Sequence, residues 1–502
     1  MRIVPFGDDA LLADLGPVDA TRRLGATRGL ATRLAAAFPG TDVVTGAGSV
    51  LVAGVAPREE VLRRARLVAE TSPDDDAPAV GALHVIETLY DGPDLDEVAS
   101  TVQLRRDEVV ALHTEPDHVV EVVGFLPGFG YLGGVDPVLR LPRRPAPRPA
   151  VAAGSVGLAA GFTGVYPFAS PGGWHLIGRT SFACFDADAA RPARLRVGDR
   201  VRFAAVVALA PRARPIVCVD AAAEGPALLV VRAPPLATVQ DRGRRGRLAE
   251  GLPPSGALDP EGAARANAAL GNEPDAAVIE VPLGALEVEA TAPIGSSVDG
   301  GAPRRLVAGE RLVVVPRTAV AYLAVSGGFG VRETLGSRST LPVAGLGGFA
   351  GRALRPGDRV PVGPDSGRRR DRRPAARPSG DEAPCDSSRP TLLRLVPTPG
   401  DARLPDAALD ELVAATWTVS RLGDRVGVRL EGARVSRASA DLGLPMPMVR
   451  GAVEITTDGT PIVLGPDHPT TGGYPVVGVL TTGAQSALAR LSPGAPVRFV
   501  VA

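Results

Sequence analysis

Short runs of aliphatic residues, separated by glycine and proline, dominate the hydrophobic pattern of this chain. Typical runs are VRFAAVVALA, LVVVP and AYLAVSGGF, each bounded by turn-forming residues. Such runs are typical of β-strands joined by tight turns, because glycine and proline favour turn conformations and interrupt helices. The pattern therefore predicts a mainly β protein.

A few segments show helical spacing instead. Residues 21–38 place leucine and alanine at helical intervals, and residues 59–70 read EEVLRRARLVAE. Residues 260–270 follow Asp259 and begin with proline, which favours a helix N-terminus. The segment DEVVALH predicts another helix, which ends at His113.

A short sequence pattern recurs three times along the β region. Residues 196–203 (RVGDRVRF), 355–362 (RPGDRVPV) and 492–500 (SPGAPVRFV) each close a glycine-rich segment. Three related closures predict three related β units.

Polar or proline-rich stretches at 71–80, 211–226 and 363–390 are expected to separate the units. The last is charged and poor in apolar residues, which is typical of a mobile linker. The predicted domains are 1–80, 81–210, 226–363 and 391–502, with a linker at 364–390.

The amino-acid composition excludes several classes of function. The 55 basic and 55 acidic residues balance, so nothing draws the chain to nucleic acid or to an anionic membrane. The sequence contains no lysine, which excludes a P-loop, Schiff-base or biotinylated lysine, and leaves arginine and backbone N–H groups to hold anions. The three cysteines form no CxxC pair, and no signal peptide or membrane-spanning run is evident. A cytoplasmic protein is expected.

Motifs in the first half carry a family resemblance. They are GFLPGFGYL (124–132), PRR (142–144), AGSVG (153–157), TGVYP (163–167) and SPGGWHLIGRT (170–180). Together they resemble the allophanate hydrolase subunit 1 family, which includes the B-type subunit of bacterial 5-oxoprolinase.

Motifs in the second half resemble the allophanate hydrolase subunit 2 family, which includes the C-type subunit of 5-oxoprolinase. They are TVQDRGRRG (238–246), PPSGALD (253–259), LGSRST (335–340), SRLGDRVGVRL (420–430), RGAVEITTDGTP (450–461) and DHPTTGGYP (467–475). Both halves also resemble the carboxyltransferase part of urea carboxylase.

The resemblance implies a fold and a role. The fold would be a small α/β N-terminal domain followed by three cyclophilin-like β-barrels in tandem. The chain would be a B–C fusion that uses ATP and Mg²⁺ to activate the lactam of 5-oxoproline by phosphorylation. A separate protein, a homologue of the A-type subunit of 5-oxoprolinase, would complete the hydrolysis to glutamate, and the chain could form a homo-oligomer.

Two other functions remain open on the same resemblance. One is a carboxyltransferase or amidolyase component that acts on urea-like substrates, which would need separate carrier and carboxylase proteins because the chain has no lysine for biotin. The other is regulation of a histidine kinase. Fusing an inhibitor to its antagonist at fixed stoichiometry makes poor regulatory sense, so an enzyme is favoured.

Candidate catalytic residues are Asp467, His468 and His113. Asp467 and His468 precede a glycine-rich turn, where a carboxylate beside an imidazole could bind metal or move a proton. A turn-capping aspartate beside a surface histidine is the alternative. His113 could equally be a histidine that stabilises a helix C-terminus. No metal ligands are identified.

Candidate anion-binding cations are Arg179, Arg338 and Arg425. Arg338 stands among hydroxyls in GSRST, whereas Arg425 follows Asp424, and a structural ion pair between these neighbours is the simpler interpretation.

Other binding candidates are small or polar. Gly154 and Ser155 offer backbone N–H groups and a hydroxyl to an oxyanion, or form an ordinary turn. Ser255 precedes the helix expected at 260–270, where it could hold an anion or act as a cap. Tyr131 and Tyr474 lie in family motifs, each with a polar tip.

Glu454 is a further binding candidate and a departure from the family pattern. Members that resemble this chain usually carry glutamine at that place in GAVEI, so the substrate could be a different lactam or amide.

Overall fold

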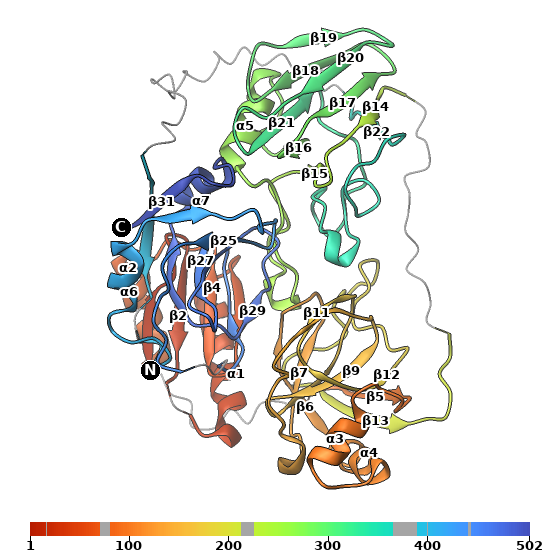
Figure 1. Ribbon diagram of the computed structural model, residues 1–502, viewed down its shortest axis with the longest axis vertical. Helices are drawn as coiled ribbons and strands as arrows, with labels where there is room; N and C mark the ends of the chain where they lie inside the picture. The colour runs from red at the N-terminus through yellow and green to blue at the C-terminus, as the bar shows by residue number, and fades with distance from the viewer. Residues whose placement is uncertain (17, 71–80, 212–224, 365–388, 399, 440–442) are drawn as a thin grey trace.

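The computed structural model describes the chain except for residues 17, 71–80, 212–224, 365–388, 399 and 440–442. The three predicted linkers therefore lie wholly or largely outside the described residues. Figure 1 shows four β-rich units in the described parts.

The first unit is an antiparallel sheet of order β1-β2-β4-β3, with helices on one face. Helices α1 (Ala20–Ala37) and α2 (Glu59–Glu70) confirm the two helices expected here. The strands are β1 (Arg2–Pro5), β2 (Ala10–Asp14), β3 (Asp42–Thr45) and β4 (Ser49–Ala53).

Strand β2 carries apolar side chains on both faces, so both faces of this sheet are packed against other elements. Leu11 and Ala13 pack towards the helices, whereas the alternating Ala10 and Leu12 belong to a second apolar cluster on the opposite face. The strand is buried along almost its whole length.

The second unit is a seven-stranded sheet of order β12-β9-β10-β7-β6-β13-β5, with a small β11-β8 sheet beside it. Its helices are α3 (Leu95–Thr101) and α4 (Arg106–Thr114). The strands are β5 (Leu83–Thr88), β6 (His118–Val123), β7 (Gly130–Gly133), β8 (Arg148–Val151), β9 (Ser155–Ala159), β10 (Phe162–Val165), β11 (Ser170–Gly172), β12 (His175–Arg179) and β13 (Arg200–Ala205).

The third unit has sheets of order β20-β17-β14-β22 and β15-β16-β21-β18-β19. Helix α5 (Pro260–Ala269) confirms the expected proline-led helix. The strands are β14 (Ala227–Arg232), β15 (Thr238–Gln240), β16 (Val278–Pro282), β17 (Leu286–Ala290), β18 (Ile294–Val298), β19 (Arg304–Leu306), β20 (Arg311–Val314), β21 (Val320–Val325) and β22 (Arg359–Pro361).

The fourth unit is a closed barrel of order β23-β30-β27-β28-β25-β24-β31, with a β26-β29 pair beside it. Its helices are α6 (Ala408–Ala414) and α7 (Thr482–Ala489). The strands are β23 (Thr391–Pro397), β24 (Trp417–Val419), β25 (Gly427–Glu431), β26 (Met446–Pro447), β27 (Ala452–Ile455), β28 (Pro461–Leu464), β29 (Thr471–Gly472), β30 (Val476–Leu480) and β31 (Pro496–Val501).

The three recurring segments at residues 196–203, 355–362 and 492–500 have the same structural role. They end in β13, β22 and β31, and each of these strands pairs with the first strand of its own unit, namely β5, β14 or β23. The fold is thus mainly β with barrel closure. Strand pairing closes the barrel of the fourth unit completely. Three full barrels remain an expectation from the resemblance.

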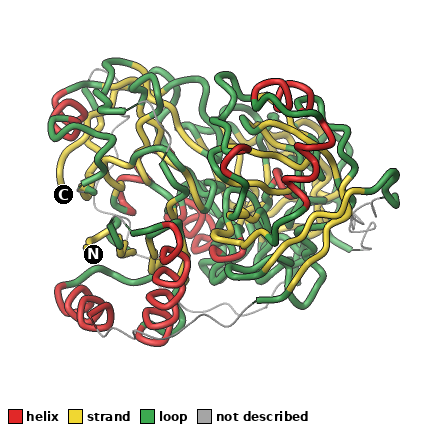
Figure 2. Tube along the Cα trace, turned by 90° about the horizontal axis from the view of Figure 1, so that it is seen from below, coloured by secondary structure: helices red, strands yellow, loops and turns green. Residues whose placement is uncertain are grey.

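The N-terminal sheet and the C-terminal barrel share a core. Phe6, Leu12 and Leu51 pack in one cluster with Met448 and Val479. Asp8 accepts hydrogen bonds of 2.9 Å from the backbone N–H and the hydroxyl of Thr482, at the start of α7. Figure 1 shows the sheet beside the barrel, and Figure 2 shows both termini on the same side of the molecule. The two ends of the chain therefore form one packed body.

Candidate functional site

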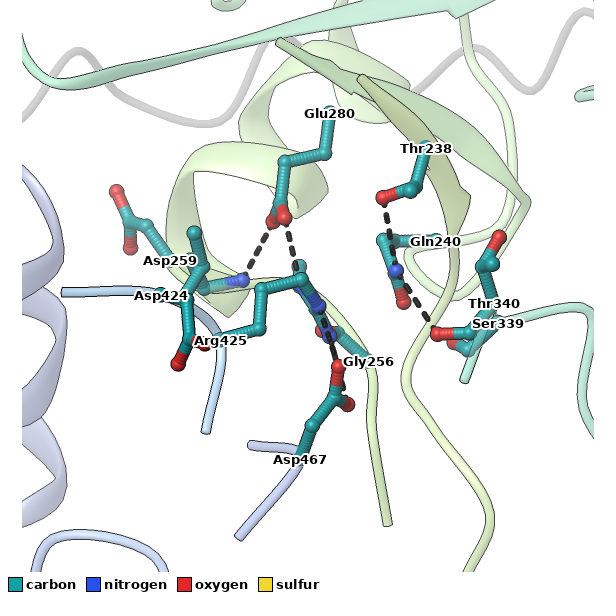
Figure 3. A network of polar contacts seen from close by, with 12 residues as sticks. Thr238, Gln240, Gly256, Asp259, Glu280, Ser339, Thr340, Asp424, Arg425 and Asp467 are labelled. Atoms are coloured by element: carbon teal, nitrogen blue, oxygen red, sulfur yellow. Dashed lines mark hydrogen bonds and ion pairs between the residues drawn. The ribbon is translucent and has the colours of Figure 1, made fainter. Parts of the chain in front are cut away.

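A buried arginine joins the third unit to the C-terminal barrel. Arg425, in the loop before β25, donates to both carboxylate oxygens of Asp467, at 2.8 and 3.2 Å. It also donates to Glu280 on β16 at 2.5 Å and to the carbonyl of Gly256 at 2.7 Å. Figure 3 shows Arg425 between the two acids. All three side chains are buried, so the ion pairs are shielded from water.

The second oxygen of Glu280 extends this network. It accepts hydrogen bonds from the Leu258 N–H at 2.6 Å and from the Tyr322 hydroxyl at 3.1 Å. The Tyr322 oxygen in turn accepts from the Asp259 N–H at 2.7 Å. Glu280 therefore holds the PPSGALD loop in place just before α5.

Asp424 is not the partner of Arg425. Its carboxylate accepts from the backbone N–H groups of Val426 and Gly427, as in an Asx turn. The interpretation of these chain neighbours as an ion pair is therefore wrong. Asp424 shapes the turn that projects Arg425 towards Asp467 and Glu280.

Arg244 is a buried cation that the sequence motifs did not single out. It donates to the carbonyls of Thr334 and Ser339, and its Nη1 has no hydrogen-bond partner among the described residues. Burial lowers its pKa to about 10, while Asp241 and Asp467 oppose that shift. Its place in the DRGRRG motif, in a chain without lysine, was the signal that could have found it.

Ser255 lies against the loop that carries Asp467. Its N–H donates to the carbonyl of Pro466 at 3.0 Å, and its backbone adopts a positive φ of 55°. The side chain is buried, and within the described structure its hydroxyl lacks a partner. The structure thus brings Ser255, Arg425, Asp467 and His468 together.

His468 presents one free nitrogen. Nδ1 lies 2.9 Å from the carbonyl of Pro469, which can only accept, so Nδ1 carries the proton and Nε2 keeps its lone pair. Burial lowers the pKa of the imidazole to about 4, so His468 is neutral at physiological pH. The Asp467 carboxylate binds Arg425 instead of orienting this ring, so the two do not form a hydrogen-bonded pair.

The segment after His468 meets the motif loop of the first half. A Cβ atom at Gly124 would lie 2.2 Å from Oγ1 and 2.4 Å from Cγ2 of Thr471. The Thr471 hydroxyl also acts on the pKa of Tyr131, although no partner satisfies regular hydrogen-bond geometry with it. GFLPGFGYL and DHPTTGGYP, the two motifs furthest apart in the chain, therefore touch.

Gly124 should tolerate no side chain. We expect Gly124→Ala to lower the free energy of unfolding by about 1–3 kcal/mol, because the added carbon forces apart two packed loops. These loops form the junction between the first and second halves of the chain. Urea unfolding would measure the loss. Gly483→Ala, at a glycine with open space around it, is the matched control and should cost nothing.

A double variant makes that test specific. Thr471→Ala removes two of the three atoms that the new carbon would meet, so it should recover part of the loss in the Gly124→Ala background. Strictly additive effects of the two substitutions would contradict a direct contact between these residues.

Glu454 on β27 is buried beside Gly472, the residue that follows Thr471. A Cβ at Gly472 would lie 2.9 Å from its Oε1. In the described structure no group donates a hydrogen bond to this carboxyl, and burial raises its pKa to about 7, with Arg403 opposing the shift. A protonated carboxyl offers one donor and one acceptor, as the glutamine usual in the family would.

The raised pKa makes stability depend on pH. The folded state favours the protonated form, so this contribution is complete below the usual value of 4.5 and is lost as pH rises through about 7. We expect Glu454→Gln to unfold like the unchanged chain at pH 4.5, and to be more stable by about 2–3 kcal/mol at pH 8.5. Denaturant titrations at both pH values measure this. Glu115→Gln, an exposed control, should show no such difference.

Other candidates lie away from this junction. His113 is buried in the core of the second unit, between the Tyr90 hydroxyl at 2.7 Å and the Thr163 hydroxyl at 2.8 Å, and burial lowers its pKa. Arg179 is 60% exposed and pairs with Asp91. Neither is brought close to Asp467.

The remaining candidates have local roles. The backbone of Gly154 exchanges hydrogen bonds with Tyr166 and Thr180, and Ser155 begins β9, where it pairs with Arg179. The Arg338 side chain turns to the Val331 carbonyl and to Glu333, while its N–H donates to Asp241. Tyr474 is half-buried just before β30, with no hydrogen bond to another described residue.

Asp241 and Gln240 organise the loop beside Arg244. Asp241 accepts hydrogen bonds from the hydroxyls of Ser337 and Ser339, at 2.6 and 2.5 Å. Gln240 donates to the Thr238 hydroxyl and the Thr340 carbonyl, as Figure 3 shows. The two serine hydroxyls of GSRST are thus engaged by this carboxylate, and the Thr340 hydroxyl donates to the Val239 carbonyl.

Two kinds of feature are missing from the described residues. They contain no group of three or more His, Cys, Asp or Glu side chains placed to hold a metal ion. They also contain no helix long and apolar enough to cross a membrane.

Comparison with known proteins places the chain in a family. The pattern described as carboxyltransferase domain, subdomains C and D, matches residues 1–195, and that of subdomains A and B matches residues 250–501. The chain belongs to the carboxyltransferase-domain family.

Individual relatives each match part of the chain. The B-type 5-oxoprolinase subunit of Haemophilus influenzae is 37% identical over 206 residues, which cover 40% of this chain and 97% of that protein. The C-type 5-oxoprolinase subunit of Escherichia coli is 32% identical over 289 residues, which cover 54% of this chain and 90% of that protein. The chain is thus a fusion of a B-type and a C-type half.

Two further relatives extend the comparison. The crystal structure of TTHA0988 is 31% identical in sequence, with a TM-score of 0.82 over 98% of this chain and 99% of that one. A urea amidolyase of Lachancea kluyveri is 28% identical over 52% of this chain, but the match covers only 16% of that protein.

Proposed function

We propose that this chain is the B–C component of an ATP-dependent 5-oxoprolinase, acting with a separate A-type subunit. The observation that carries the proposal is the meeting of the motif loops at Gly124 and Thr471. A single chain that matches both smaller subunits almost completely, and packs their motifs against each other, supports one shared site at the junction.

The chemistry of the substrate defines what the site must supply. A lactam resists attack by water because its amide is stabilised by resonance. Transfer of the γ-phosphoryl group of ATP to the lactam oxygen removes that stabilisation, releases ADP and leaves an electrophilic carbon. The A-type subunit would then complete hydrolysis to glutamate and phosphate.

Residues near the Arg425 network fit the phosphate part of this task. Arg244 and Ser255 are buried and keep a free donor each, Nη1 and Oγ. We propose that these two groups hold phosphate oxygens, in place of the lysine that the chain lacks. We propose that a Mg²⁺ ion enters on the nucleotide, because Mg²⁺ usually keeps several water molecules and binds through substrate phosphates.

His468 fits the role of a proton acceptor or hydrogen-bond acceptor. Its Nε2 is unprotonated at neutral pH and is fixed in direction by the bond from Nδ1 to Pro469. It stands between the Arg425 network and the Thr471 contact, which is where a substrate at the junction would lie. A neutral lactam N–H could donate to it.

One experiment tests the function. The purified chain is mixed with a homologue of the A-type subunit, Mg-ATP and 5-oxoproline, and the release of glutamate and ADP is measured. We expect both products to depend on all components. ATP consumption that 5-oxoproline does not stimulate would refute the proposal, and turnover with urea in place of 5-oxoproline would support the amidolyase alternative.

A further inference from the structure

Residues 142–148 (PRRPAPR) contain three arginines, and acidic side chains neutralise only two of them. Arg144 donates to Asp94 at 3.1 Å and to Glu97 at 2.7 Å, and Arg148 donates to Asp94 at 2.5 Å. Among the residues that the structure describes, no acid lies within ion-pair distance of Arg143, and it has no hydrogen-bond partner there. The segment thus carries one unpaired positive charge.

The backbone on both sides of Arg143 is fixed. The His175 imidazole donates to the Pro142 carbonyl at 3.0 Å, and the Arg144 N–H donates to the Gly173 carbonyl at 2.8 Å. Side-chain ion pairs then hold Arg144 to α3 and the segment before it. A flexible surface arginine would not need such support, because its position would not matter.

The backbone of Arg143 lies beside an aromatic cluster near the junction, because its neighbours Pro142 and Arg144 are hydrogen-bonded to His175 and Gly173, on either side of Trp174. The charge of Arg143 acts to lower the pKa of both Tyr131 and Tyr166, against the dominant effect of burial, which raises both. Phe129 and Trp174 contact both tyrosine rings, with ring centroids 5.0–6.4 Å apart. Tyr131 in turn approaches Thr471 of the C-type half. Arg143 therefore lies on the B-type side of the site where the halves meet.

We propose that Arg143 binds the carboxylate of a small acidic substrate at the junction of the two halves. One unpaired guanidinium matches one negative charge, and its planar fork can bind both oxygens of a carboxylate. A phosphate group would suit Arg244 and Ser255 better, since they lie beside the Arg425 network in the C-type half. That the acid is 5-oxoproline rests on the proposed function.

Calorimetric titration of the full chain tests this with three probes: 5-oxoproline, 2-pyrrolidinone, which is the same ring without the carboxylate, and Mg-ATP. We expect Arg143→Gln to bind 5-oxoproline about 10- to 100-fold more weakly, the loss expected for one charge-assisted pair. Binding of Mg-ATP and of 2-pyrrolidinone should not change. Arg143→Lys, which keeps the charge but not the fork, should lose less.

Arg202→Gln is the matched control, because Arg202 lies on β13 of the same unit but is half exposed and paired with Asp117. It should leave all three affinities unchanged. Thermal unfolding of each variant would show that the fold is kept. If Arg143→Gln does not fold, Arg143→Lys carries the test, with a smaller loss of 5-oxoproline affinity as the expected result.

Several outcomes would overturn the inference. They are unchanged 5-oxoproline affinity in Arg143→Gln, weakening of Mg-ATP alone, and an unchanged chain that binds 2-pyrrolidinone as well as 5-oxoproline. The glutamate-release assay keeps the two proposals apart. Arginine-dependent binding without turnover refutes the function and supports this inference, whereas full turnover by Arg143→Gln does the reverse.

Discussion

Replacing Arg425 with methionine should lower the free energy of unfolding by about 3–5 kcal/mol. The substitution keeps an unbranched apolar stem but leaves Glu280 and Asp467 buried without their counterion. Taking a carboxylate out of water without compensation is costly, and two acids in one pocket also repel each other. Urea unfolding, followed by the fluorescence of Trp417 in the barrel core, measures the loss of stability.

Two further variants make this test specific. Arg434→Gln breaks an ion pair in the same barrel whose partners are both 62% exposed, and should cost less than about 1 kcal/mol. Combining Arg425→Met with Glu280→Gln and Asp467→Asn removes all the charges, and should recover much of the stability. A triple variant as unstable as Arg425→Met would show that the shape of the arginine matters more than its charge.

Replacing His468 with glutamine should reduce 5-oxoproline-dependent turnover by about 100-fold or more. The free Nε2 lies at the junction and is the accepting atom proposed for the reaction. Glutamine fills a similar volume but cannot accept and release a proton at neutral pH. His84→Gln is the control variant, because His84 is partly exposed and paired with Asp199 in the second unit. Its 5-oxoproline-dependent turnover should equal that of the unchanged chain.

The same variant has a readout that does not depend on the function. Between pH 6.5, the usual value, and the lowered pKa of about 4, the unfolded chain binds a proton at His468 that the folded chain does not. Stability therefore falls as pH drops through this range, by about 3 kcal/mol for this residue. His468→Gln should show a correspondingly smaller loss between pH 7 and pH 4. An unchanged pH dependence would contradict the burial of a neutral imidazole.

Local patterns predicted much of the secondary structure. The leucine spacing of residues 21–38 and the Asp259-Pro260 start of α5 each identified a helix correctly, because such signals lie within a few neighbouring residues. Helices α3, α6 and α7 are only seven or eight residues long, too short for a clear period, and were not predicted. Contacts between units are a property of the tertiary fold. The packing of the N-terminal sheet on the last barrel therefore could not be read from the chain.

The residues of the candidate site could be predicted in part from sequence motifs. Asp467, His468, Ser255 and Arg425 were selected from motifs, and they do lie together. The partner of Arg425 was misassigned because the nearest acid in sequence, Asp424, turns its carboxylate to the backbone, whereas Glu280 is 145 positions away. Arg143 and Arg244 lie in sequence motifs, but the motifs do not show which of their arginines lacks an acidic partner in the folded chain.

Because the two chain ends share a core, part of the N-terminal sheet stays uncovered during synthesis until the end of the chain is made. The N-terminal sheet leaves the ribosome with Phe6, Leu12 and Leu51 exposed on one face, and their partners Met448 and Val479 follow about 400 residues later. At typical rates of translation, that interval is on the order of tens of seconds. During it the nascent chain carries an apolar sheet face that, apart from a contact with Leu248, only the last unit covers among the described residues. Chaperone demand should therefore peak before the C-terminal barrel is made, and truncated chains that end before residue 446 should aggregate.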